Sequence, residues 1–152
     1  MNSEYLMSCG FKEFPAFEIK KCGLKKYPEF IEKLAEPGVY VFCLKAQFPR
    51  LKGKTDILYI GQAGNRNGRA IWKRLNEYRG QADAHDKRMR DDLERIPRER
   101  KSQLRLFYKF VIPPRQCGNE EAKLLGEFYR DHIELPPMNM NRGAKIIAEQ
   151  LH

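Results

Sequence analysis

Two apolar segments decide the fold of this chain: Gly38-Val39-Tyr40-Val41-Phe42-Cys43-Leu44 and Ile57-Leu58-Tyr59-Ile60-Gly61. Both are rich in β-branched and aromatic residues, a composition that favours buried β-strands. Pro37 punctuates the chain before the first segment, and a loop rich in Lys, Pro and Gly (45–54) joins the two. Neighbouring strands joined by one loop are typical of an antiparallel hairpin.

Hydrophobic periodicity predicts further elements after this hairpin. They are a helix over 70–78, a charged and solvated helix over 86–101, a strand over 103–112 and a helix over 119–133. Asn119 is a suitable N-cap for the last helix, which stops before Pro136. This order predicts an α+β fold: a small, mostly antiparallel, three-stranded sheet flanked by helices.

The length of 152 residues suits one globular domain. We expect residues 1–36, which carry a short helix over 27–34, to form an N-terminal attachment that packs on the core. Residues 37–152 would then form the main domain, which contains the hairpin.

Composition limits the class of protein and its partners. Lys and Arg number 29 against 20 Asp and Glu, which gives a net charge of +9 and favours a polyanionic partner. No apolar run approaches the roughly 20 residues that span a bilayer, and the N-terminus does not read as a signal peptide. Four scattered cysteines predict neither a zinc site nor a disulfide framework. We therefore expect a cytoplasmic protein with no membrane partner.

Two tripeptides at the ends of the predicted strands, and four single residues later in the chain, occur in a definite order. They are Gly38-Val39-Tyr40, Tyr59-Ile60-Gly61, Arg74 with Tyr78 four residues later, Glu127, and Asn139 twelve residues after it. In this order they resemble the GIY-YIG endonuclease superfamily over about residues 37–140. The chain is most similar in layout to small, standalone members of restriction type. The resemblance implies that family's compact fold and metal-dependent hydrolysis of DNA phosphodiester bonds.

The resemblance also implies a role for two residues late in the chain. Glu127 would be the ligand of a divalent metal, Mg²⁺ or Mn²⁺, because a carboxylate suits a hard cation. The helical pattern by itself places Glu127 outside the apolar arc of its helix, where it reads as a solvated acid. Asn139 would support the site by hydrogen bonding to the backbone around the strands.

Catalysis would fall to residues on the strands and on the first helix after them. Arg74 would hold the scissile phosphate, since a guanidinium offers a fixed fork of donors. Tyr78 lies four residues further on and could reach the same phosphate. Tyr40 would act as general base or orient the attacking water, with Tyr59 beside it on the neighbouring strand.

One position departs from the family pattern. The residue after Tyr59-Ile60-Gly61 is often Lys in the family, but it is Gln62 here. A neutral amide cannot lower a tyrosine pKa, so Lys73 or a metal-bound water would have to help instead. The predicted DNA-binding residues, which would position the phosphate backbone, are Gln62, Arg66, Arg69, Lys73 and Arg79.

The sequence thus predicts a metal-dependent endonuclease that acts on double-stranded DNA, of restriction or phage-defence type and associated with the nucleoid. One alternative is a structure-selective repair or recombination nuclease. Another is a catalytically silent nucleic-acid-binding module of the same fold. One active centre hydrolyses one strand at a time. We therefore expect two chains to pair as a homodimer on DNA.

Overall fold

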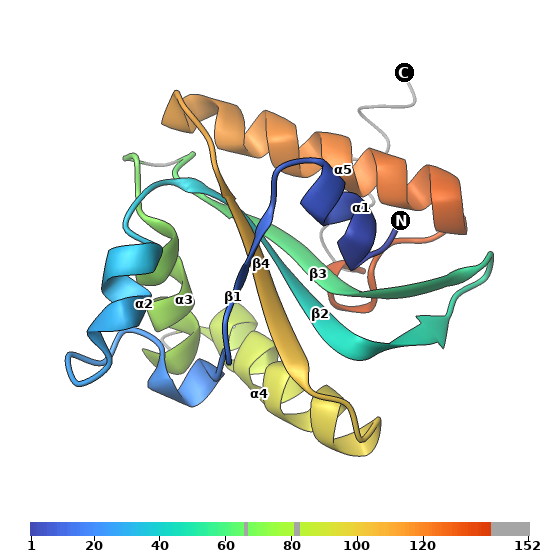
Figure 1. The fold of residues 1–152 in the computed structure, drawn as a ribbon, viewed down its shortest axis with the longest axis horizontal. Helices are drawn as coiled ribbons and strands as arrows, with labels where there is room; N and C mark the ends of the chain where they lie inside the picture. Colours follow the sequence, from blue (N-terminus) through green and yellow to red (C-terminus); the bar gives the residue numbers. More distant parts are fainter. Residues whose placement is uncertain (66, 81–82, 141–152) are drawn as a thin grey trace.

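A four-stranded antiparallel sheet in the order β1-β4-β2-β3 forms the centre of the protein. The computed structural model describes residues 1–65, 67–80 and 83–140 (Figure 1). The strands are β1 (Lys12–Phe14), β2 (Gly38–Pro49), β3 (Lys54–Ala63) and β4 (Leu104–Phe110). The expected α+β class and antiparallel hairpin are confirmed, but the sheet has four strands rather than three. Because β1 has only three residues, it is too short to show the alternation of a strand.

Helices cover both faces of this sheet (Figure 1). They are α1 (Ser3–Ser8), α2 (Pro28–Lys33), α3 (Ile71–Gly80), α4 (Ala84–Glu99) and α5 (Cys117–His132), with short 3₁₀ turns η1 (Ile19–Lys21), η2 (Pro114–Gln116) and η3 (Pro137–Asn139). One buried cluster joins α2, α3 and α4 to the face of β2 that carries Tyr40 and Phe42. A second joins α1 and α5 to the opposite face, which carries Val39 and Val41. Successive strand residues point to opposite faces, which produces this division.

The N-terminal segment is built into both layers. Its strand β1 pairs with β4, Phe14 and Phe30 stack 4.8 Å apart in the first cluster, and Leu6 is buried in the second. At the start of α1, the backbone N–H and the hydroxyl of Ser3 both donate to the buried carboxylate of Asp56 on β3. Residues 1–36 therefore supply a strand and part of the core as well as packing on its surface.

The last helix begins earlier than the sequence predicts. Its first residue is Cys117, its N-cap is Gln116 without a side-chain capping bond, and Asn119 lies in the first turn. The amide of Asn119 donates to the side chain of Gln116 instead of capping the helix. The 3₁₀ turn η2 leads directly into α5, so the backbone is already helical before the polar residue that the pattern selects.

Within the described ranges 1–65, 67–80 and 83–140, no helix has the length and apolar character needed to cross a bilayer.

Candidate active site

The two strand-end tyrosines lie together over Gly61. In the β2–β3 hairpin Tyr40 is directly opposite Gly61, and the Tyr40 and Tyr59 ring centroids are 6.2 Å apart. A Cβ atom on Gly61 would lie only 2.5 Å from Cε1 of Tyr59 and 2.8 Å from Cζ of Tyr40. Gly61 is therefore required because both rings occupy the space above its Cα atom.

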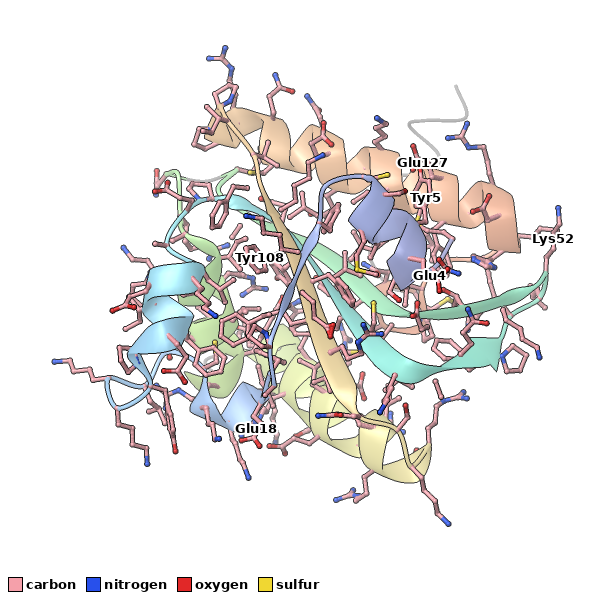
Figure 2. All side chains as sticks on the ribbon, viewed as in Figure 1. Glu4, Tyr5, Glu18, Lys52, Tyr108 and Glu127 are labelled. Atoms are coloured by element: carbon pink, nitrogen blue, oxygen red, sulfur yellow. The ribbon has the colours of Figure 1, made fainter. Side chains whose placement is uncertain are left out.

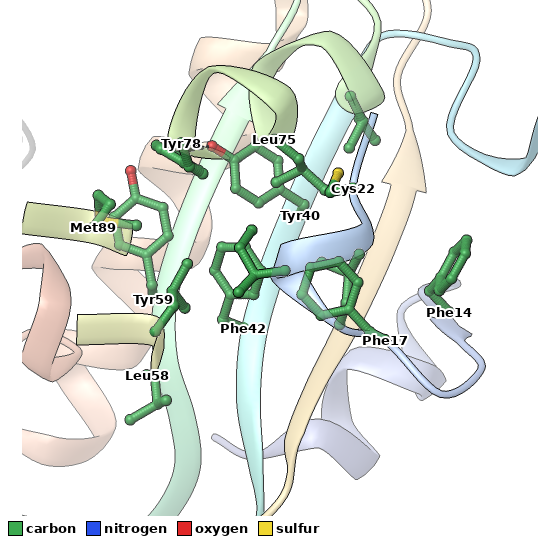
Figure 3. Packing of buried hydrophobic residues seen from close by; sticks show 14 of the residues in the cluster. Phe14, Phe17, Cys22, Tyr40, Phe42, Leu58, Tyr59, Leu75, Tyr78 and Met89 are labelled. Carbon is green, nitrogen blue, oxygen red and sulfur yellow. Dashed lines mark hydrogen bonds between the residues drawn. The ribbon is translucent and has the colours of Figure 1, made fainter. Parts of the chain in front are cut away.

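Helix α3 adds Tyr78 and Arg74 to this pair. The hydroxyl oxygens of Tyr40 and Tyr78 are 2.6 Å apart and share a hydrogen bond, and Figure 3 shows the Tyr40 hydroxyl directed toward Tyr78. The Arg74 guanidinium lies 4.4 Å from the centre of the Tyr78 ring, within cation–π range. The predicted residues Tyr40, Tyr59, Arg74 and Tyr78 thus come together, and we call these four the tyrosine–arginine cluster.

Burial sets the charge state of this cluster. Tyr40 and Tyr78 are fully buried, and burial is the main cause that raises the pKa of both phenols well above the ordinary value of about 10. Burial alone would lower the pKa of Arg74, but its polar neighbours outweigh this effect and raise it. At neutral pH Arg74 is a cation and the phenols are protonated. The geometry therefore favours Tyr40 as a hydrogen-bond donor over the expected role of general base.

The hydroxyl of Tyr59 is a buried polar atom without a hydrogen-bond partner among the described residues. Tyr59 is only 1% exposed, and its ring stands beside Met89 of α4 (Figure 3). A buried hydroxyl without a partner costs about 1–3 kcal/mol, so such a group usually marks a place where water or a ligand binds. The Tyr59 hydroxyl can therefore still donate and accept a hydrogen bond inside the cluster.

Asn139 fastens the outer edge of the hairpin, as the sequence predicts. Its Oδ1 atom accepts a hydrogen bond from the backbone N–H of Ile60 at 2.9 Å, and its Nδ2 atom donates to the Ile60 carbonyl at 2.8 Å. Because β3 is the last strand of the sheet, these backbone groups have no neighbouring strand on that side. The amide of Asn139 takes the place of that missing strand at the centre of the Tyr59-Ile60-Gly61 segment.

The structure does not bring Glu127 to the tyrosine–arginine cluster. Glu127 lies against α1, where its carboxylate accepts a hydrogen bond of 2.9 Å from the hydroxyl of Tyr5 (Figure 2). These two residues line a shallow pocket of about 390 Å³ with Met1, Arg130 and Asp131. The N-terminal segment thus occupies the Glu127 carboxylate, and the expected grouping of Glu127 with Arg74 and Tyr40 is wrong.

A different acid of α5, Glu121, lies near the cluster. Glu121 is 4% exposed, and its negative charge adds to the burial that raises the pKa of Tyr40. The preceding turn of α5 lies by the end of β3, because a Cβ atom on Gly118 would be 3.2 Å from the Asn65 amide. Glu121 is six residues before Glu127, about 9 Å along the helix axis. Glu121 is one of the buried residues of α5, and a buried acid is unusual because charged side chains are rarely fully buried.

The acidic residues limit what kind of metal site the cluster could form. Among the described residues, no group of three or more His, Cys, Asp or Glu side chains could hold a metal ion. Mg²⁺ and Mn²⁺ can be held by one or two carboxylates together with water and substrate oxygens. Glu121 fits this requirement by its chemistry and by its position near Tyr40, whereas Glu127 lies against α1 and accepts a hydrogen bond of 2.9 Å from Tyr5.

The predicted DNA-binding residues have mixed surroundings. Gln62 accepts a hydrogen bond from the Asn65 N–H through its side chain, and strand alternation directs it to the face opposite Gly61. Arg69 forms an ion pair with Glu77 of α3. Arg79 donates to the carbonyl of Cys22 and to Asn76, so it links α3 to the N-terminal segment. Lys73 is exposed, with its ammonium 5.7 Å from the Trp72 ring centre, and Arg66 lies outside the described residues.

Comparisons with protein-family models, with curated proteins and with solved structures gave no match for this chain.

Proposed function

We propose that this chain is a metal-dependent endonuclease that hydrolyses DNA phosphodiester bonds, with the tyrosine–arginine cluster as its centre. The observation that carries this proposal is the convergence of Tyr40 and Tyr59 over Gly61 with Arg74 of α3. These are positions to which the resemblance to the GIY-YIG pattern assigns catalytic roles, and Arg74 comes near Tyr40 of the hairpin from a separate helix.

The chemistry available in the cluster suits a phosphodiester substrate. Arg74 provides a permanent cation with several N–H donors, which match the oxygens of a phosphate. Tyr40 and Tyr78, whose pKa values burial raises, provide protonated hydroxyls that can donate to phosphate oxygens or orient water. The hydroxyl of Tyr59, which has no partner among the described residues, is the group most available for such a bond.

Glu121 is the residue that would hold the divalent cation in this proposal. The cation would supply a Lewis acid for the negative charge that develops on the phosphate during hydrolysis. The substrate would be double-stranded DNA, and a double-strand break would take two chains, one for each strand.

The burial of the cluster favours a second candidate function, a nucleic-acid-binding module without catalysis. Tyr40, Tyr59 and Tyr78 are at most 1% exposed and Arg74 is 8% exposed, so the described structure leaves little room for a phosphate. In this second function the cluster would only hold α3 on the hairpin. Lys73 and other exposed cations would then bind the phosphate backbone.

One set of cleavage assays separates these functions. The purified chain would be incubated with supercoiled plasmid in Mg²⁺ or Mn²⁺, with EDTA as the control. Glu121→Gln and Glu127→Gln form a matched pair, because both change one α5 carboxylate to an amide. Arg74→Gln removes the cation from the cluster, and circular dichroism would show that each variant is folded.

The proposal expects cation-dependent nicking that is lost in Glu121→Gln and Arg74→Gln and retained in Glu127→Gln. Loss of about two or more orders of magnitude is typical when a single donor of this kind is removed. Binding of DNA without cleavage in any cation would favour the silent module. Cleavage that needs Glu127 but not Glu121 would overturn our choice of carboxylate, and preference for branched over linear DNA would indicate a repair-type nuclease.

A further inference from the structure

Helix α4 covers the cluster and places a buried carboxylate on its arginine. Asp86, in the first turn of α4, is 4% exposed, and its Oδ1 atom lies 3.0 Å from Nη1 of Arg74. The same nitrogen donates to Oε2 of Glu77 at 2.5 Å. Two carboxylates of the protein therefore occupy the guanidinium that we propose for phosphate binding.

The sequence of α4 sets the inward position of Asp86. The side chain of Asp83 is the N-cap and accepts a hydrogen bond of 2.8 Å from the Asp86 N–H, which fixes the first turn. Met89 and Leu93 follow Asp86 at helical spacing and are buried in the same cluster as Tyr40. Asp86 is therefore the polar end of a stripe whose apolar members hold α4 over the tyrosines.

The charge balance around Arg74 opposes the entry of an anion. Glu77 bridges Arg69 and Arg74, and Asp86 adds a second negative charge, so two cations face two carboxylates. A phosphodiester that approaches this group meets no net positive charge. It can gain the donors of Arg74 only where one of the carboxylates moves away.

Of the two carboxylates, Asp86 is the one whose release would also open the cluster. Glu77 lies on α3 three residues after Arg74, so it moves together with the arginine. Asp86 lies on a different helix. That helix also carries Met89, which is buried in the same cluster as Tyr59, and His85, whose ring centroid is 6.4 Å from that of Tyr78. Movement of the start of α4 would therefore expose the arginine and the tyrosines together.

We propose that Asp86 is an autoinhibitory latch, which holds α4 over the cluster until a nucleic-acid phosphodiester replaces its carboxylate on Arg74. This inference rests on the proposed function, because it names the event that gives substrate access to that site. The partner that releases the latch is the phosphate backbone, which offers Arg74 the same anionic oxygens as Asp86.

The test compares Asp86→Asn with Asp92→Asn. The first change keeps the shape and the acceptor oxygen of Asp86 but removes its charge. The second removes a charge from the same helix, where Asp92 pairs with Arg95 away from the cluster. Hydrogen–deuterium exchange of residues 71–80 and 84–99 without DNA measures the opening of α4. Single-turnover cleavage and fluorescence anisotropy with a DNA duplex measure access to the site.

We expect Asp86→Asn to exchange about tenfold faster than the wild type at the start of α4, as loss of about 1.4 kcal/mol predicts. It should also cleave DNA faster, or bind it more tightly if no variant cleaves, by a similar factor. Asp92→Asn should match the wild type in both measurements. Melting temperatures of the two variants would show that the whole fold is kept.

The possible results separate the latch from the nuclease function. Fast exchange with tighter DNA binding but no cleavage by any variant would support the latch and overturn the nuclease. Wild-type exchange in Asp86→Asn would overturn the latch, whether or not the protein cleaves DNA. Slower cleavage or weaker binding in Asp86→Asn would also overturn it, and would make Asp86 a residue that positions Arg74 for the substrate.

Discussion

Replacement of Asn139 by Ala should remove the support for the hairpin edge. Asn139 is 1% exposed and its side chain makes two hydrogen bonds, both with the backbone of Ile60, which is itself fully buried. Alanine can make neither bond. The N–H and the carbonyl of Ile60 would then be buried without a partner on the outer side of the sheet.

The expected loss follows from these two bonds. A buried polar group without a partner costs about 1–3 kcal/mol, so two such groups should lower the free energy of unfolding by about 2–6 kcal/mol. That is a large part of the stability of an ordinary domain. Urea denaturation followed by circular dichroism measures it, and the denaturant slope should not change because the folded surface is nearly the same.

Asn119→Ala is the matched control. The Asn119 amide is exposed and bonds to the side chain of Gln116 on the surface, so its loss should change the free energy of unfolding by no more than about 0.5 kcal/mol. A loss below about 1 kcal/mol in Asn139→Ala would show that Ile60 finds other partners. The account of the hairpin edge given above would then be wrong.

Three further predictions follow from burial in the same core. Gly61→Ala should destabilise the fold by about 1–3 kcal/mol in thermal melts, because the added Cβ would meet the rings of Tyr40 and Tyr59. Gly80→Ala on α3, where the added Cβ has open space, should be neutral or slightly stabilising. Burial raises the pKa of Cys22 to about 12, so a thiol reagent at pH 8 should leave Cys22 unmodified in the folded protein. The reagent should react first with the half-buried Cys9, which peptide mass spectrometry would show. Burial raises the pKa of Tyr40 in the folded state, so the contribution of Tyr40 to stability should be complete below about pH 10 and decrease as the pH rises further. Tyr40→Phe should reduce this loss of stability at alkaline pH, measured by urea denaturation.

Much of the fold could be predicted because its signals are long and regular. The β2–β3 hairpin and the buried stripe of α5 extend over ten or more residues, so their periods are visible in the sequence. The strand β1 was missed because its three residues owe their conformation to pairing with β4, which is distant in the chain. The start of α5 was misplaced because η2 extends the helical backbone past Asn119.

The candidate site was predictable only where the backbone dictates the residue. Gly61 and Asn139 answer local demands of the hairpin, and both lie as their positions in the motif imply. The expectation that Glu127 is the metal ligand depended on the resemblance to the GIY-YIG pattern and not on any local feature of α5. The helical pattern places Glu127 outside the apolar arc, and the structure adds that Glu121, four residues before Leu125, is one of the buried residues of α5. Burial, which only the folded structure reveals, is the reason why we propose Glu121 in place of Glu127.

The burial that makes this cluster recognisable also limits its chemistry. Hydroxyls that are fully buried stay protonated, so they can position an oxygen but cannot accept its proton at neutral pH. The cation of the cluster is balanced by Glu77 and Asp86, so it attracts a phosphate only after one of them is displaced. The proposed activity must therefore depend on access to Arg74 more than on the ionisation of a tyrosine. A pH–rate profile without a tyrosine step between pH 7 and 10, combined with a faster Asp86→Asn, is the result that this reasoning requires.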